Sequence, residues 1–143
     1  MKTARICAIL AACLLTAISF AQTPAAPATQ PTTRQIGAAI SPSEFASLIG
    51  KPGHVLLDVR TNEEFAAGHL AGATLIDFNA PDFQQKIRAL PKDKTYLVYC
   101  RSGRRSKNAC DQMRELGFPG LFDLQGGILA WQKAGRPTQG SNP

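Results

Sequence analysis

The 143-residue sequence lacks the charge patterns that are typical of nucleic-acid-binding proteins. It has no run of lysines and arginines and no basic stretch interleaved with aromatic residues, so no nucleic-acid partner is expected. It also has no internal repeat, which excludes a repeat array. Charged residues make up only 18% of the chain and hydrophobic residues 44%, which argues against wholesale disorder. The length suits one ordinary domain with a core of its own.

Long hydrophobic runs are absent except near the N-terminus. Residues 6–20 are almost all apolar and follow two basic residues, with small residues before a cleavage point after Ala21. This pattern predicts a signal peptide over residues 1–21 and an exported, periplasmic protein without a membrane span after cleavage. The run is short for a spanning helix, which needs ~20 residues. A lipoprotein anchored through Cys13 is the alternative, because residues 10–13 resemble a lipobox.

Composition divides the rest of the chain into three parts. Residues 22–35 are rich in Ala, Pro and Thr and have no apolar period, so we expect a disordered linker there. A folded domain is predicted over residues 36–136, where strand and helix patterns alternate. A flexible tail is predicted over residues 137–143.

Cysteine is scarce once the leader is removed. Two of the four cysteines lie in the predicted signal peptide, which leaves Cys100 and Cys110. Export favours a disulfide, but Cys100 follows a predicted strand and Cys110 lies two turns into the next helix. Their Cα atoms should therefore be farther apart than the ~7 Å that a disulfide allows. We expect Cys110 to be a packed core thiol, with a resolving cysteine as the alternative.

Short strands alternate with helices along the domain. Strands are predicted at residues 54–59, 74–76, 95–99 and 121–124. Helices are predicted between Ser41 and Gly50, at residues 62–67, 81–90 and 104–116, and around Trp131. This alternation predicts an α/β fold with a parallel sheet that is covered by helices on both faces. Folds of this kind bind ligands at the carboxyl ends of their strands.

Cys100 stands at such a strand end, directly before a loop of Arg, Ser and Gly and the start of a helix. Backbone N–H groups and the positive end of the helix dipole converge there and stabilise a thiolate, so Cys100 is a candidate nucleophile. The alternative is a small hydrophobic residue that closes a buried strand. Gly103 allows a positive φ, and with it an anion-binding nest of N–H groups. The neighbouring basic residues indicate a small anionic ligand; they are Arg101, Arg104, Arg105 and Lys107.

Several motifs together carry a resemblance. They are Leu57-Asp58-Val59-Arg60, Glu64-Phe65, Gly68-His69-Leu70-Ala71-Gly72-Ala73, Cys100-Arg101-Ser102-Gly103-Arg104-Arg105-Ser106, Gly117-Phe118 and Leu124-Gln125-Gly126-Gly127-Ile128-x-x-Trp131. In this order they closely resemble the rhodanese family, over about residues 36–135. The chain departs from the family at Ala71, where a proline is usual, and we expect this to soften a turn without affecting the chemistry.

The resemblance implies a short, parallel, five-stranded sheet and a sulfurtransferase reaction. Cys100 would take a sulfane sulfur from thiosulfate as a persulfide and pass it to cyanide or a thiol, with no cofactor and no metal. The loop residues would bind the anionic substrate; they are Arg101, Ser102, Gly103, Arg104, Arg105 and Ser106. Related phosphatases have a loop that is one residue longer, Cys-x5-Arg, whereas four residues separate Cys100 from Arg105 here.

Two further residues, Asp58 and Arg60, follow a predicted strand and should lie at the same sheet edge. They are candidates for a supporting role, in which Asp58 shapes the pocket or holds the loop. The structural interpretation, which we favour, pairs Arg60 with Glu63 or Glu64 and gives Asp58 hydrogen bonds within its loop. His69 is expected to be a packed, hydrogen-bonded residue and not a catalytic base. An alternative function for the whole chain is a periplasmic sulfur-carrier or binding module that serves a protein partner. A rhodanese-like phosphatase is a further alternative, which the shorter loop disfavours.

Overall fold

The computed structural model describes residues 37–140. The predicted signal peptide with Cys13, the predicted linker over residues 22–35 and the last three residues lie outside this part of the chain. Within residues 37–140, none of the helices has the length and apolar character needed to cross a membrane.

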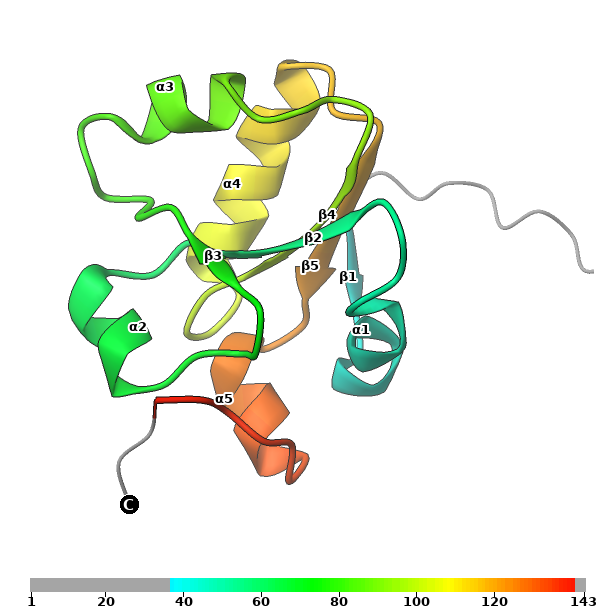
Figure 1. The fold of residues 1–143 in the computed structure, drawn as a ribbon, viewed down its shortest axis with the longest axis vertical. Helices are drawn as coiled ribbons and strands as arrows, with labels where there is room; N and C mark the ends of the chain where they lie inside the picture. Colours follow the sequence, from blue (N-terminus) through cyan, green and yellow to red (C-terminus); the bar gives the residue numbers. More distant parts are fainter. Residues whose placement is uncertain (1–36, 141–143) are drawn as a thin grey trace, which may run out of the picture. The chain divides into compact units, whose positions relative to one another are not determined.

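Five parallel strands form one sheet in the order β1-β5-β4-β2-β3 (Figure 1). The strands are β1 (Ala38–Ile40), β2 (His54–Asp58), β3 (Thr74–Leu75), β4 (Thr95–Tyr99) and β5 (Gly120–Leu124). The predicted α/β class and five-stranded parallel sheet are therefore confirmed. The central strand β4 is buried over its last four residues and lies between β2 and β5. Its carboxyl end leads directly to Cys100.

The first strand is the element that the sequence did not reveal. β1 has only three residues, Ala38, Ala39 and Ile40, which pair in parallel with Phe122–Leu124 of β5. Two alanines give no strand signal, because strand propensity reflects branched or aromatic side chains that pack on a pleated surface. The backbone hydrogen bonds to β5 therefore define this edge strand, and Ile40 adds contact with the core.

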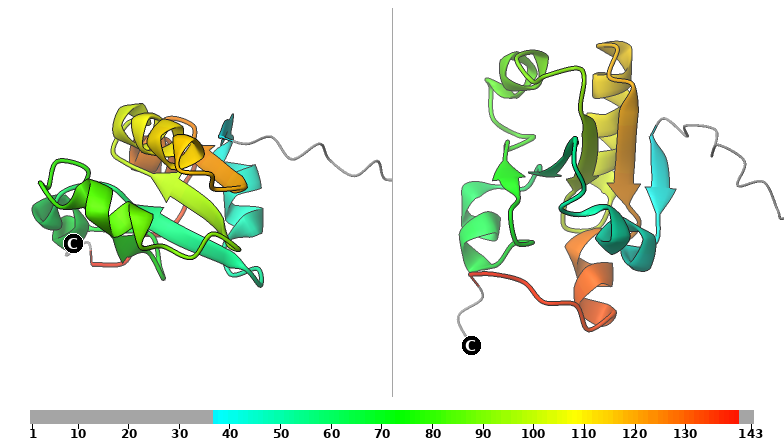
Figure 2. Two further views of the ribbon diagram at one scale, coloured as in Figure 1. Left: turned by 90° about the horizontal axis from the view of Figure 1, so that it is seen from above. Right: turned by 45° about the vertical axis from the view of Figure 1, so that its right-hand side comes forward.

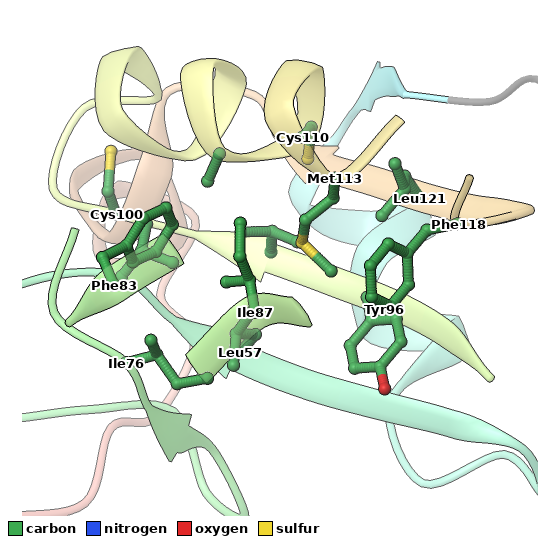
Figure 3. Packing of buried hydrophobic residues seen from close by; sticks show 13 residues of the cluster. Leu57, Ile76, Phe83, Ile87, Tyr96, Cys100, Cys110, Met113, Phe118 and Leu121 are labelled. Carbon is green, nitrogen blue, oxygen red and sulfur yellow. The ribbon is translucent and has the colours of Figure 1, made fainter. Parts of the chain in front are cut away.

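Helices cover both faces of the sheet, as predicted. They are α1 (Pro42–Leu48), α2 (Asn62–Ala67), α3 (Phe83–Arg88), α4 (Arg104–Glu115) and α5 (Gly127–Lys133). Apolar side chains of α3 and α4 form one core with β2, β4 and β5, in which Phe83, Ile87 and Met113 are buried (Figure 3). Phe45 of α1 and Trp131 of α5 anchor a second core. Figure 2 shows α4 and α1 on opposite sides of the sheet.

Side-chain caps define where two of the helices begin. Ser41 and Glu44 form a reciprocal capping box at α1, which the sequence predicts, and Thr61 and Glu64 form a second one at α2. Each box satisfies two N–H groups that have no partner within the helix. In α2 the box also fixes the position of the Glu64 carboxylate, which the site uses.

The chain beyond α5 returns to the segment after α2. Gln139 and His69 exchange two backbone hydrogen bonds, of 2.8 and 2.7 Å, and the Trp131 indole donates to the carbonyl of Pro137 at 2.9 Å. These contacts lie beyond residue 136, where the sequence suggests that the domain ends. His69 also stacks on Phe65 with 3.8 Å between ring centroids, and its Nδ1 lies 3.0 Å from the Phe65 carbonyl oxygen. His69 is thus packed and hydrogen-bonded, as expected.

Candidate active site

Cys100 lies at the carboxyl end of β4, between the strand and the first turn of α4. Gly103, which caps the helix, has a φ of +96°, a left-handed conformation that favours glycine. The turn directs the N–H groups of the loop back toward the sulfur. The side chain of Cys100 is only 1% exposed, so the loop backbone replaces water around it. Cys100 therefore lies at the strand end where the sequence predicts it, and Gly103 has the positive φ that the sequence allows.

Hydrogen-bond donors surround the Cys100 sulfur. The Gly103 N–H lies 3.1 Å from Sγ and the Ser106 hydroxyl lies 3.4 Å from it. Burial would raise the pKa of the thiol, but the hydroxyl and N–H of Ser106 and the N–H groups of Ser102 and Gly103 outweigh it, and the net pKa is lowered. Because the sulfur also faces the N-terminus of the 12-residue helix α4, the site favours thiolate over thiol.

The turn between β5 and α5 supports the Cys100 loop. The Ile128 N–H donates to the Cys100 carbonyl at 2.9 Å, and the Leu129 N–H donates to the Arg101 carbonyl at 3.2 Å. Gly127 lies so close that a Cβ atom there would be 2.5 Å from the Cys100 oxygen. Sequence reasoning did not give Gly127 a role in the site. The paired glycines before Ile128 are the signal that could have pointed to it.

Arg105 is bound to an acidic partner that was not predicted for it. Its guanidinium forms two hydrogen bonds with the Glu64 carboxylate, of 2.7 and 2.8 Å, and it also contacts Cys100. The ion pair raises the pKa of Arg105 and lowers that of Glu64. Because the capping box at Thr61 already orients Glu64, this carboxylate holds Arg105 against the sulfur. Glu64 is thus a site residue that sequence reasoning missed, and its capping position was the available signal.

The prediction for Arg60 was wrong in its partner. Arg60 pairs with Asp58 and not with Glu63 or Glu64: the closest N···O distance is 2.7 Å, and Arg60 also donates to the Gly68 carbonyl at 2.7 Å. Glu64 is occupied by Arg105, and the short spacing between Asp58 and Arg60 in the chain places the guanidinium directly against the carboxylate. Asp58 is fully buried and Arg60 is 4% exposed, so this pair ties the end of β2 to the segment after α2.

Two cavities flank the loop. The larger, of about 440 Å³, is lined by Phe78, Asn79, Arg101, Ser102, Arg104, Arg105 and Asn108. The smaller, of about 200 Å³, is lined in part by Arg60, Glu64, Arg101 and Leu129. Arg101 and Arg104 are exposed and have no ion-pair partner among residues 37–140. Positive charge is therefore available for an anion at the wall of the larger cavity.

The second cysteine takes no part in the site. Cys100 and Cys110 are both free, so the prediction that they do not form a disulfide is confirmed. Cys110 packs in the core with Ala109 and Met113, and burial raises the pKa of its thiol strongly. Within residues 37–140, no group of three or more His, Cys, Asp or Glu side chains could hold a metal ion.

Comparisons with known proteins identify the family. The rhodanese-like domain model matches residues 41–134, and the chain belongs to this family. An uncharacterized protein of Synechocystis is 36% identical over 104 residues; the match covers 73% of this chain and 57% of that protein. Thiosulfate sulfurtransferase 16, chloroplastic, of Arabidopsis thaliana is 37% identical over 97 residues, covering 61% of this chain and 81% of the relative.

A solved structure agrees with this assignment. The crystal structure of a rhodanese-related protein from Thermoplasma volcanium superimposes with a TM-score of 0.65 at 29% identity, covering 72% of this chain and 98% of the other. The chain thus has the rhodanese-like fold that its motifs predicted.

Proposed function

We propose that this protein is a thiosulfate sulfurtransferase that carries sulfur as a persulfide on Cys100. The proposal is carried by one observation: the loop that surrounds the Cys100 sulfur with hydrogen-bond donors also lines a cavity that is walled by arginines. The family assignment and the sulfurtransferase names of its relatives support a sulfurtransferase-family role. The choice of thiosulfate rests on the charge of the cavity, because thiosulfate is a small dianion.

The proposed reaction has two displacement steps. The Cys100 thiolate attacks the outer sulfur of thiosulfate, the S–S bond of the donor breaks, and sulfite leaves with the electron pair. The resulting persulfide anion extends about 2.05 Å beyond Sγ and keeps the donors of the loop around it. Cyanide or a thiolate then attacks the outer sulfur and restores the Cys100 thiolate. Arg101 and Arg104 would attract the dianion, and Arg105, fixed by Glu64, would orient it.

Loop length separates this proposal from phosphate chemistry. Four residues separate Cys100 from Arg105, and the loop closes tightly enough that both Gly103 and Ser106 reach the same sulfur. A phosphatase loop with one more residue has a wider ring of N–H groups, which fits a tetrahedral phosphate. Hydrolysis of an aryl phosphate at a rate comparable to sulfur transfer would contradict the proposal.

The test measures sulfite release from thiosulfate in the presence of cyanide. The purified protein should turn over, and Cys100→Ser should abolish turnover, because a serine hydroxyl stays protonated and is a poor nucleophile for sulfur. Cys110→Ala is the matched control: it removes the other buried thiol and should keep the activity. Equal turnover in the Cys100→Ser protein would refute the assignment.

A sulfur-carrier role is the second candidate, and one observation favours it. Leu129 is the one large hydrophobic side chain that is exposed among residues 37–140, at 45%, and it lines the smaller cavity beside Arg101. A protein acceptor could contact it there. In that case protein isolated from cells would carry the mass of one added sulfur on Cys100 yet use thiosulfate poorly. The same mass measurement would reveal whether the chain is cleaved after Ala21, as proposed for an exported, periplasmic protein, or is lipidated at Cys13.

A further inference from the structure

A buried carboxyl group lies behind the Cys100 loop without a complete set of partners. Asp123, on β5, is 5% exposed, and its Oδ1 is the one buried side-chain oxygen or nitrogen within residues 37–140 that has no hydrogen-bond partner. An ionised carboxylate in such a place would lose much of its solvation without full compensation. Burial of a protonated carboxyl group costs much less solvation free energy, so the surroundings of Asp123 favour its protonated form.

Ser106 connects this carboxyl group to the nucleophile. Its side chain is fully buried, its hydroxyl lies 3.4 Å from the Cys100 sulfur, and Ser106 also interacts with the Asp123 carboxyl group, whose pKa it lowers. A hydroxyl has a single proton to donate, so Ser106 can donate to only one of these two neighbours at a time. The three side chains form a continuous path from the thiol to the carboxylate.

We propose that Asp123 is a positioning residue that receives the Cys100 proton through Ser106 and then holds the Ser106 hydroxyl as a donor to the sulfur. The thiol proton passes to the Ser106 oxygen while the original Ser106 proton passes to Asp123. The products are a thiolate, an unchanged serine and a carboxylic acid, so the number of protons and the net charge are the same before and after. The inference rests on Cys100 being the nucleophile of the proposed function.

The surroundings of the two ends both shift the proton from Cys100 toward Asp123. N–H groups of the loop stabilise the thiolate, whereas burial raises the pKa of Asp123 to about 6. The groups of α4 that face Asp123 are Lys107, Cys110 and Asp111, and of these Lys107 lowers the pKa while Asp111 raises it. The paired residues of the neighbouring strands, Ala39 and Val98, do not titrate.

The test is a titration of the Asp123 carboxyl carbon by NMR in the full-length protein. If Asp123 and Cys100 share a proton, a thiolate must raise the carboxyl pKa, so Cys100→Ala should lower that pKa by at least about one unit. Cys110→Ala is the matched control: it removes a thiol that also faces Asp123 but stays neutral, so it should lower the carboxyl pKa by less than Cys100→Ala does. Equal pKa values in the wild type and Cys100→Ala would overturn the proposal. Because no sulfur donor is used, failure of the thiosulfate assay would leave this result intact.

A second measurement follows the nucleophile itself. The rate of Cys100 alkylation by iodoacetamide, resolved by peptide mass, should show two inflections with pH in the wild type, since the thiol and then Asp123 lose protons. Asp123→Asn should show one inflection, whereas Asp111→Asn, which removes an acidic group of α4 outside the path, should keep both. Two inflections in Asp123→Asn would refute the path, and a purely structural role of Asp123 would not change their number.

Discussion

Gly127 offers a sharp test of how the active-site loop is held in place. It has a φ of +61°, and its Cα faces the backbone of Cys100 and Arg101. In Gly127→Ala the new Cβ would lie 2.5 Å from the carbonyl carbon and oxygen of Arg101 and from the Cys100 oxygen. Backbone atoms on both sides of the nucleophile must then move, because no flexible side chain is there to give way.

The size of the effect follows from this distance. Ordinary contact begins near 3.4 Å, so the loop must retreat by about 0.9 Å. A displacement of about 1 Å in a catalytic group costs about 10²-fold in rate, and the same loss is expected in kcat/KM for thiosulfate. The left-handed conformation adds a stability cost of about 1–2 kcal/mol for any residue with a Cβ.

Gly135→Ala is the matched control for the conformational cost. Gly135 has a φ of +69°, but no atom lies within 4 Å of the place that a Cβ would occupy, so alanine there is strained without touching the loop. Both variants should lose stability in urea through the left-handed conformation, and Gly127→Ala should lose more because of its clash. Only Gly127→Ala should lose sulfite release and show a raised pKa of the Cys100 thiol. Equal kcat/KM in the two folded variants would refute the idea that the β5–α5 turn sets the loop.

Three further predictions concern the surroundings of the site. Glu64→Gln keeps the cap of α2 but loses the charge that holds Arg105, so the KM for thiosulfate should rise about tenfold (roughly 1.4 kcal/mol). The control Glu63→Gln, at an exposed position, should leave KM unchanged. Ala71→Pro should stabilise the turn closed by the Ala73 N–H and Leu70 carbonyl by about 0.4–1 kcal/mol in urea; a loss of stability would contradict this. Asp123 binds its proton up to about pH 6 in the folded state and only up to about pH 4 in the unfolded state. The free energy of unfolding therefore falls as pH rises through this window. Asp123→Asn should raise the free energy of unfolding by about 3 kcal/mol at pH 8 and leave it unchanged at pH 3.

The sequence was most informative where local patterns coincide with the architecture. The apolar run before Cys100 predicted the central strand, and the Ser41 cap predicted the start of α1. The position of Cys100 at a strand end predicted the site, because parallel strands direct their carboxyl ends to one edge. Each of these inferences depends on residues that are neighbours in the chain.

What the sequence did not predict depends on contacts across the fold. Glu64 lies 41 residues from Arg105, and its capping position distinguishes it from Glu63 without indicating Arg105 as its partner. Gly127 supports the carbonyl groups of a loop that lies much earlier in the chain, and Asp123 reads as one polar position in a short apolar strand. The contacts of Gly127 and Asp123 become visible only when the register of β4 and β5 is known.

The two cysteines show why the loop, and not the burial of the thiol, makes a nucleophile. Each is 1% exposed, and each belongs to the same apolar core. Burial raises the pKa of Cys110 strongly because little in its surroundings offsets the loss of water. At Cys100 the same penalty is overcome by N–H groups and a hydroxyl that converge on the sulfur from the next few residues of the chain. Since burial is common to both, the difference in reactivity must come from the turn at Gly103, and any change that opens this turn should make Cys100 as inert as Cys110.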